Sequence, residues 1–148
     1  RDFRSSRGLG DVYKRQLYCQ SGKLSQVFMN IIVNAVQATE GRWSDPEERV
    51  VRVELDRALD GEGKAHSIIV RVRDNGTGMD EETQQHLFDP FFTTKEIGKG
   101  TGLGLSIVKG ILDDHGAQIR VESKMGEGTT FVLTFPLDIM SNPNSEAA

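Results

Sequence analysis

The sequence predicts an α+β domain in which helices pack on one face of a β-sheet. Apolar residues recur with helical spacing in two long segments and with a period of two in four shorter ones. The segments with a period of two come in adjacent pairs, with helical segments before and between the pairs. This order is typical of the α+β class, because an amphipathic sheet needs helices to cover its apolar face.

The composition is that of one globular domain. The chain has 148 residues, of which 36% are hydrophobic and 27% charged, enough for one core and too few for two ordinary domains. No apolar run approaches the ~18 residues of a bilayer span. A net charge of −4 disfavours a broad nucleic-acid surface. The single cysteine, Cys19, excludes an internal disulfide framework and a cysteine-cluster metal site.

The chain divides into three parts. Residues 1–16 mix Arg, Ser and Gly without an apolar period, so we expect a disordered or non-native lead-in. Residues 17–137 carry the periodic patterns and form the predicted domain. The polar residues 138–148 are expected to form a flexible tail.

The helices are predicted from apolar residues at i, i+3, i+4 and i+7. A first helix is expected over 24–38, with Ser21 or Gly22 near its N-cap. A short helix is expected over 80–88. A second amphipathic helix follows a glycine-rich loop and ends at Gly116. Its inward residues are Leu105, Val108, Ile111 and Leu112.

The strands are predicted from alternating apolar and polar residues. The first pair, 51–56 and 70–73, predicts an antiparallel hairpin with one buried face. The second pair, 119–121 and 131–135, is joined by a glycine turn. The residues of the first pair that are expected to face the core are Val51, Val53, Leu55, Val70 and Val72.

Amides line the polar side of the first predicted helix. Gln26, Asn30 and Asn34 lie one turn apart, although Asn is a mediocre helix former. A solvated helix face would explain them. The alternative is a set of neutral oxygen ligands for a metal–phosphate group, because Mg²⁺ binds one or two protein oxygens and substrate phosphates.

The motif Asp-Asn-Gly-Thr-Gly at 74–78 directly follows a predicted strand. Gly76 and Gly78 would let the backbone approach a flat ligand, and Asp74 would accept a hydrogen bond from an adenine amino group. A tight turn after a strand is the simpler explanation.

A glycine-rich loop at 98–105 opens the second amphipathic helix. Its backbone N–H groups and the helix dipole would favour an anion, and Lys95 and Lys99 add positive charge. The loop matches neither the P-loop nor the dinucleotide-binding fingerprint. Before it, three phenylalanines within 88–92 indicate a hydrophobic latch, a docking patch or a small core cluster.

Together, in this order, the motifs resemble the catalytic and ATP-binding domain of bacterial sensor histidine kinases, in the superfamily of gyrase, Hsp90 and MutL. The resemblance covers about residues 17–136. It implies the Bergerat ATP-binding fold, a two-layer α/β sandwich with a mixed, mostly antiparallel sheet. The segments that resemble the family's N box, first G box, F box, second G box and terminal glycine turn are 26–35, 74–78, 88–92, 100–105 and 126–131.

The resemblance also implies roles for single residues. Asn34 would contribute an oxygen to Mg²⁺, while Asn30 and Lys95 would act as catalytic residues at the phosphates. Asp74 would bind the adenine amino group, with Thr129 nearby. The other residues implied in binding ATP are Gly76, Gly78, Lys99, Gly100, Thr101, Gly102, Leu103, Gly104 and Leu105, with 89–101 as a mobile lid.

None of the three histidines lies in a His-Glu motif on a long helix. We therefore expect the phosphoacceptor on a dimerisation domain outside this chain, and a response regulator receiver domain as a further partner. The chain by itself is expected to be monomeric, cytoplasmic and inactive in transfer, without nucleic-acid or membrane contact. An ATP-binding module without transfer activity remains an alternative.

Two further alternatives are an anti-sigma-type serine kinase and an ATPase of the superfamily. Both usually carry an acidic residue where Asn30 stands. An amide cannot accept a proton at neutral pH, so Asn30 disfavours both alternatives.

Overall fold

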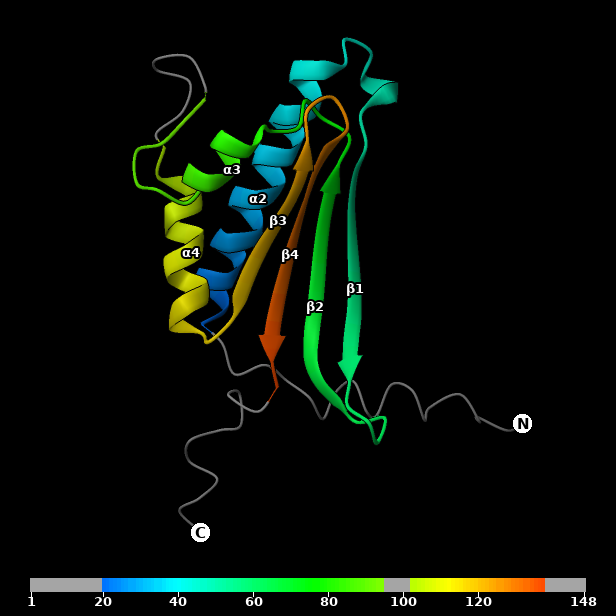
Figure 1. Cartoon of the computed structure of the whole chain (residues 1–148), viewed down its shortest axis with the longest axis vertical. Coiled ribbons are helices and arrows are strands. Elements are labelled where there is room, and N and C mark those ends of the chain that lie inside the picture. The colour runs from blue at the N-terminus through cyan, green and yellow to red at the C-terminus, as the bar shows by residue number, and fades with distance from the viewer. Residues whose placement is uncertain (1–19, 95–101, 138–148) are drawn as a thin grey trace, which may run out of the picture.

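Four strands form one antiparallel sheet, and the helices lie over one of its faces (Figure 1). The computed structural model describes residues 20–94 and 102–137. This two-layer arrangement confirms the predicted α+β class. The elements in chain order are α2 (Ser21–Arg42), the 3-10 helix η1 (Pro46–Glu48), β1 (Val51–Leu59), β2 (Ala65–Asp74), α3 (Glu81–His86), α4 (Gly104–Asp114), β3 (Gln118–Lys124) and β4 (Gly128–Pro136).

The strand order is β1-β2-β4-β3, and each neighbouring pair is antiparallel. The described sheet is therefore fully antiparallel, whereas we expected a mixed, mostly antiparallel sheet. The register places one apolar row across all four strands. Val53 is opposite Val72, Val72 is opposite Phe131, and Phe131 is opposite Val121. Residues directly opposite share a face, so this row belongs to the helix-facing side of the sheet.

The core lies between this sheet face and the apolar faces of α2 and α4. Val27 and Ile31 from α2 and Leu112 from α4 are fully buried. Phe135 of β4 is also buried, and its ring centroid lies 6.5 Å from that of Phe28. The predicted helical periods therefore identify the buried faces correctly, because both helices contribute i, i+3 and i+4 residues to one contact.

The ends of the helices differ from the expectations. α2 begins with Gln20 as N-cap rather than Ser21 or Gly22, since the Gln20 carbonyl accepts from Lys23 and Leu24. It also continues four residues beyond the predicted end, to Arg42. α3 begins as expected, with the Asp80 carboxylate capping the N–H of Thr83 at 2.8 Å.

The expected burial of Val53 and Leu55 is wrong. Both side chains lie on the helix-facing side, yet they are 54% and 75% exposed. β1 is an outer strand of the described sheet, and the helices lie toward the opposite, β3 edge (Figure 1). Their partners Val72 and Val70 belong to the next strand inward and are buried.

Three expectations concern segments outside the described residues: the lead-in at 1–16, most of the lid, and the tail at 138–148. Within 20–94 and 102–137, no helical stretch combines the length and the hydrophobicity that a bilayer span requires.

Candidate functional site

A buried carboxyl group stands at the end of β2. Asp74 is 3% exposed, and its Oδ1 accepts from the backbone N–H groups of Gly76 at 2.8 Å and Thr129 at 3.3 Å. Burial raises the pKa of Asp74 above its ordinary value, and these two hydrogen bonds offset only part of the rise. Within the described part of the chain no donor contacts Oδ2, which leaves an acceptor for a ligand amino group.

The glycines of the motif after Asp74 fit tightly against other segments. A Cβ on Gly76 would lie 2.5 Å from the backbone carbon of Ala38 in α2. A Cβ on Gly78, whose φ is +68°, would lie 1.9 Å from the carbonyl oxygen of Lys124 in β3. These glycines therefore let the motif approach the protein's own backbone, which holds the motif in place.

Thr129 lies next to Asp74, as the resemblance implied. It is buried, and its hydroxyl lies 2.8 Å from the Ser123 hydroxyl. Ser123 also accepts from the N–H of Met79 at 2.9 Å. A polar chain thus connects both ends of the 74–79 loop to β3 and β4.

The amides of α2 meet the start of α4. Asn30 is half-buried, and its Nδ2 donates to the Gly104 carbonyl at 3.2 Å. Asn34 is also half-buried, one turn further along the same helix. α2 therefore joins the two glycine motifs: Asn30 contacts Gly104 of the second motif, and the Ala38 carbonyl accepts from Thr77 N–H in the Asp74 loop at 3.2 Å.

The second glycine motif is described only in part. Gly102 and Leu103 precede α4, and Gly104 and Leu105 begin it. The backbone of Phe91, with φ +65°, lies against Gly102. The predicted site residues Lys95, Lys99, Gly100 and Thr101 lie outside the described residues.

The three phenylalanines within 88–92 have separate surroundings. Phe88 packs against the core, and Phe92 lies 5.8 Å from the ring of His86. Phe91 is 75% exposed. The core-cluster interpretation therefore fits Phe88 and does not fit Phe91.

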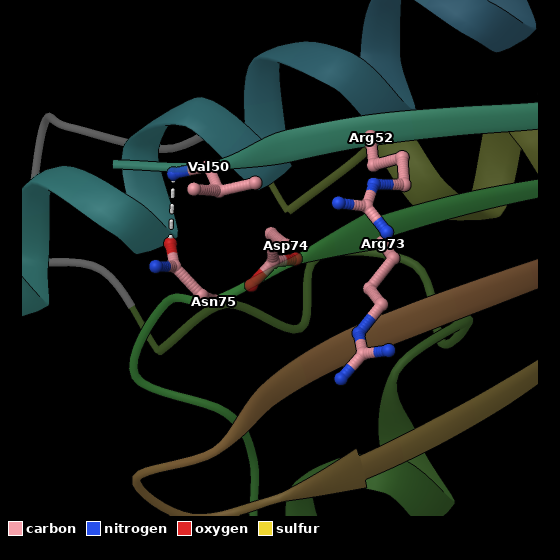
Figure 2. A pocket seen from close by; sticks show the side chains of 5 residues that line it. All are labelled: Val50, Arg52, Arg73, Asp74 and Asn75. Carbon is pink, nitrogen blue, oxygen red and sulfur yellow. Dashed lines mark hydrogen bonds between the residues drawn. The ribbon is translucent and has the colours of Figure 1, made fainter. Parts of the chain in front are cut away.

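A pocket opens beside Asp74 and is lined by residues of β1, β2 and their flanking turns (Figure 2). Arg52 and Arg73 lie directly opposite each other in the register and both line it. None of its lining residues comes from α2 or α4, so it differs from the space expected for the phosphates. Its full lining is Val50, Arg52, Arg73, Asp74 and Asn75.

Sequence reasoning missed three residues that fix this region. Trp43 and Arg42 donate to backbone carbonyls of the Asp74 loop, and Ser123 connects β3 to it. Nothing in the local pattern around Ser123 indicates this contact, which joins residues 44 positions apart. Trp43 is the only tryptophan of the chain, which could have drawn attention to it.

Comparison with known proteins gives the family. Residues 19–139 match the family described as histidine kinase-, DNA gyrase B- and HSP90-like ATPases. The chain belongs to this family. The matched residues include the Asp74 motif, Asn30 and Asn34 of α2, and the second glycine motif. The candidate site therefore lies within an ATPase-family domain.

Relatives of this ATPase-family domain are sensor kinases. Sporulation kinase E of Bacillus subtilis is 37% identical over 121 residues, which are 82% of this chain and 15% of that protein. The catalytic domain of histidine kinase ThkA superposes with a TM-score of 0.63 at 30% identity, covering 82% of this chain and 72% of that one. Full-length ShkA, in complex with AMPPNP, gives a TM-score of 0.63 at 27% identity, covering 82% of this chain and 23% of that one. The chain thus spans 15% of sporulation kinase E and 23% of full-length ShkA.

Proposed function

We propose that this domain binds Mg–ATP and acts as the catalytic domain of a sensor histidine kinase. The buried Asp74 carboxyl carries the proposal, because Oδ1 is held by two backbone N–H groups and Oδ2 is open to an amino group. Asp74 also lines the pocket at the end of β2, so a ligand there can donate a hydrogen bond to Oδ2. Adenine offers such a donor and guanine does not offer it at the same position.

Different residues would bind the two ends of ATP. Asp74 and Thr129 bind the adenine end, and Asn34 offers an amide oxygen to Mg²⁺. Asn30, together with Lys95, Lys99 and the backbone N–H groups of 100–105, holds the phosphates. Bound ATP would supply the phosphoryl group, while these residues orient it and neutralise its charge, which is most of what phosphoryl transfer requires.

Asn30 favours transfer over hydrolysis that relies on a side-chain base. An amide can donate to an oxygen, as it does to the Gly104 carbonyl, but it cannot take a proton from water. The acceptor would be a histidine on a dimerisation domain of the same parent protein, and the phosphoryl group would pass to a response regulator. We propose that the domain lies in the cytoplasm, where ATP is available, and that the chain by itself is a monomer.

Calorimetric titration with a non-hydrolysable ATP analogue, with and without Mg²⁺, tests the binding step. Asp74→Asn replaces an acceptor by a donor toward adenine, and we expect about 5- to 150-fold weaker binding. Asp80→Asn is the matched control, because Asp80 caps α3 on the surface. Equal affinities for ATP and GTP in the wild type, or unchanged affinity in Asp74→Asn, would refute the adenine role.

A second measurement separates a kinase from a binding module without transfer. The chain is mixed with a dimerisation domain of a related sensor kinase and labelled ATP. Label on the histidine of that domain supports the kinase. Nucleotide binding without label on any tested dimerisation domain would favour the binding module.

A further inference from the structure

The C-terminal end of α2 contacts the loop after β2 through two side chains. Trp43 donates its indole N–H to the carbonyl oxygen of Asn75 at 2.8 Å. Arg42 donates to the same oxygen at 3.1 Å and to the Gly76 carbonyl at 3.3 Å. The Arg42 guanidinium also lies 4.4 Å from the centre of the Trp43 ring, so the two side chains support one another.

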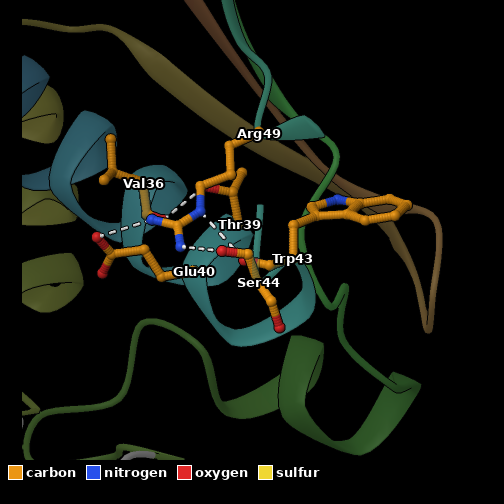
Figure 3. A network of polar contacts seen from close by, with 6 residues as sticks. All are labelled: Val36, Thr39, Glu40, Trp43, Ser44 and Arg49. Atoms are coloured by element: carbon orange, nitrogen blue, oxygen red, sulfur yellow. Dashed lines mark hydrogen bonds and ion pairs between the residues drawn. The ribbon is translucent and has the colours of Figure 1, made fainter. Parts of the chain in front are cut away.

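The backbone of Trp43 is itself held in place. Arg49 donates to the Trp43 carbonyl at 3.1 Å and to the Ser44 carbonyl at 3.4 Å, and it pairs with Glu40 at 3.5 Å (Figure 3). The Trp43 N–H closes the end of α2 on the Thr39 carbonyl at 2.8 Å. The indole therefore extends from a fixed point of the backbone.

Asn75 is fixed from its other side as well. Its Oδ1 accepts from the Val50 N–H at 2.9 Å (Figure 2), and its Nδ2 donates to the Glu48 carbonyl at 2.8 Å. The loop is thus held between the end of α2 and the segment that enters β1.

One peptide unit joins Trp43 to Asp74. The Asn75 carbonyl that Trp43 binds and the Gly76 N–H that binds Asp74 Oδ1 belong to the same peptide group. That group is planar, so fixing the direction of its carbonyl also fixes the direction of its N–H. Hydrogen bonds at both ends polarise it in the same sense, which strengthens each of them.

We propose that Trp43, supported by Arg42, is a positioning residue that orients the Asp74 carboxyl and thereby sets the preference for adenine over guanine. This inference rests on the proposed ATP site. Neither side chain needs to touch the nucleotide, because both act through the peptide group between Asn75 and Gly76.

Trp43→Phe tests the link, since it removes the indole N–H and keeps a ring under Arg42. We expect the ATP analogue to bind about three- to tenfold more weakly, the scale of one net hydrogen bond. The preference for the ATP analogue over a GTP analogue should fall with it. In the free protein, the Gly76 amide should exchange with solvent faster, while the Gly126 amide, bonded to the Thr77 carbonyl, serves as reference.

Two comparisons separate positioning from a loss of stability. In an Asp74→Asn background, Trp43→Phe should cost little further affinity, because the group it orients has already changed. Arg42→Lys, at an exposed position, should show the same effects in smaller measure.

Three results would overturn the inference: unchanged Gly76 exchange, an equal rise at Gly126, or additive losses in the double variant. Failure of the wild type to bind any nucleotide would instead refute the proposed function, and with it the claim about adenine preference. The exchange at Gly76 is measured without nucleotide, so it tests the link to Asp74 in either case.

Discussion

Replacing Gly78 by alanine should destabilise the domain by about 2–5 kcal/mol. The first part of this figure is the left-handed backbone, since φ at Gly78 is +68° and such a conformation costs a residue with a Cβ roughly 1–2 kcal/mol. The second part is the collision, since the new Cβ would lie 1.9 Å from the Lys124 carbonyl oxygen. Overpacking of this kind costs typically about 1–3 kcal/mol, because backbone must move.

Gly126→Ala is the matched control for this prediction. Its φ of +75° carries the same backbone cost, but nothing lies within 4 Å of the added Cβ. Urea unfolding of both variants at 25 °C should give roughly 1–2 kcal/mol for Gly126→Ala and a clearly larger loss for Gly78→Ala. Equal losses would show that the collision is relieved without cost, and the argument that Gly78 fixes the loop against β3 would fail.

Three other changes have expected outcomes. Asp74→Asn should raise the free energy of unfolding at neutral pH, because burial raises the pKa of Asp74 and the wild type therefore loses stability as pH rises through that pKa. The unfolding curves of variant and wild type should converge near pH 4. A lower unfolding midpoint for the variant at pH 7 would contradict this prediction. Asp80→Ala should lower the free energy of unfolding at neutral pH and have less effect in acid, since hydrogen bonds from Thr83 lower the Asp80 pKa and the charged carboxylate stabilises the fold. A loss of stability that does not change with pH would show that the charge of Asp80 does not contribute. Leu55→Thr should leave the unfolding midpoint within error of wild type, because Leu55 is 75% exposed, and a large drop would mean that it is covered in solution.

The helices and strands could be predicted from the local spacing of apolar residues. Which element packs against which other element largely could not. The period over 24–38 identifies the buried side of α2. Residues 39–42 have no apolar period, yet the helix continues through them and ends where the Trp43 N–H donates to the Thr39 carbonyl. Val53 and Leu55 alternate as a buried strand would. Alternation reports which side of a sheet a residue faces, not whether a helix lies above it.

The candidate site shows the same division. Asp74 could be identified from its place after a strand and before two glycines, and its burial agrees with that interpretation. Thr129 lies 55 positions away in sequence, so only the family resemblance pointed to it. Trp43 and Arg42 could not be found in this way, because their contacts depend on where α2 ends relative to β2.

α2 affects the geometry of the whole candidate site, because this single helix contacts both glycine motifs. Asn34 and Trp43 are nine positions apart on α2 and its cap, which at 1.5 Å per residue is about 13 Å along the axis. The helix therefore fixes the distance between the amide proposed to bind Mg²⁺ and the residue proposed to orient Asp74. Inserting or deleting one residue between them would change the spacing by about 1.5 Å and rotate one contact by about 100° relative to the other. The length of α2 therefore determines whether both proposed contacts can form at the same time.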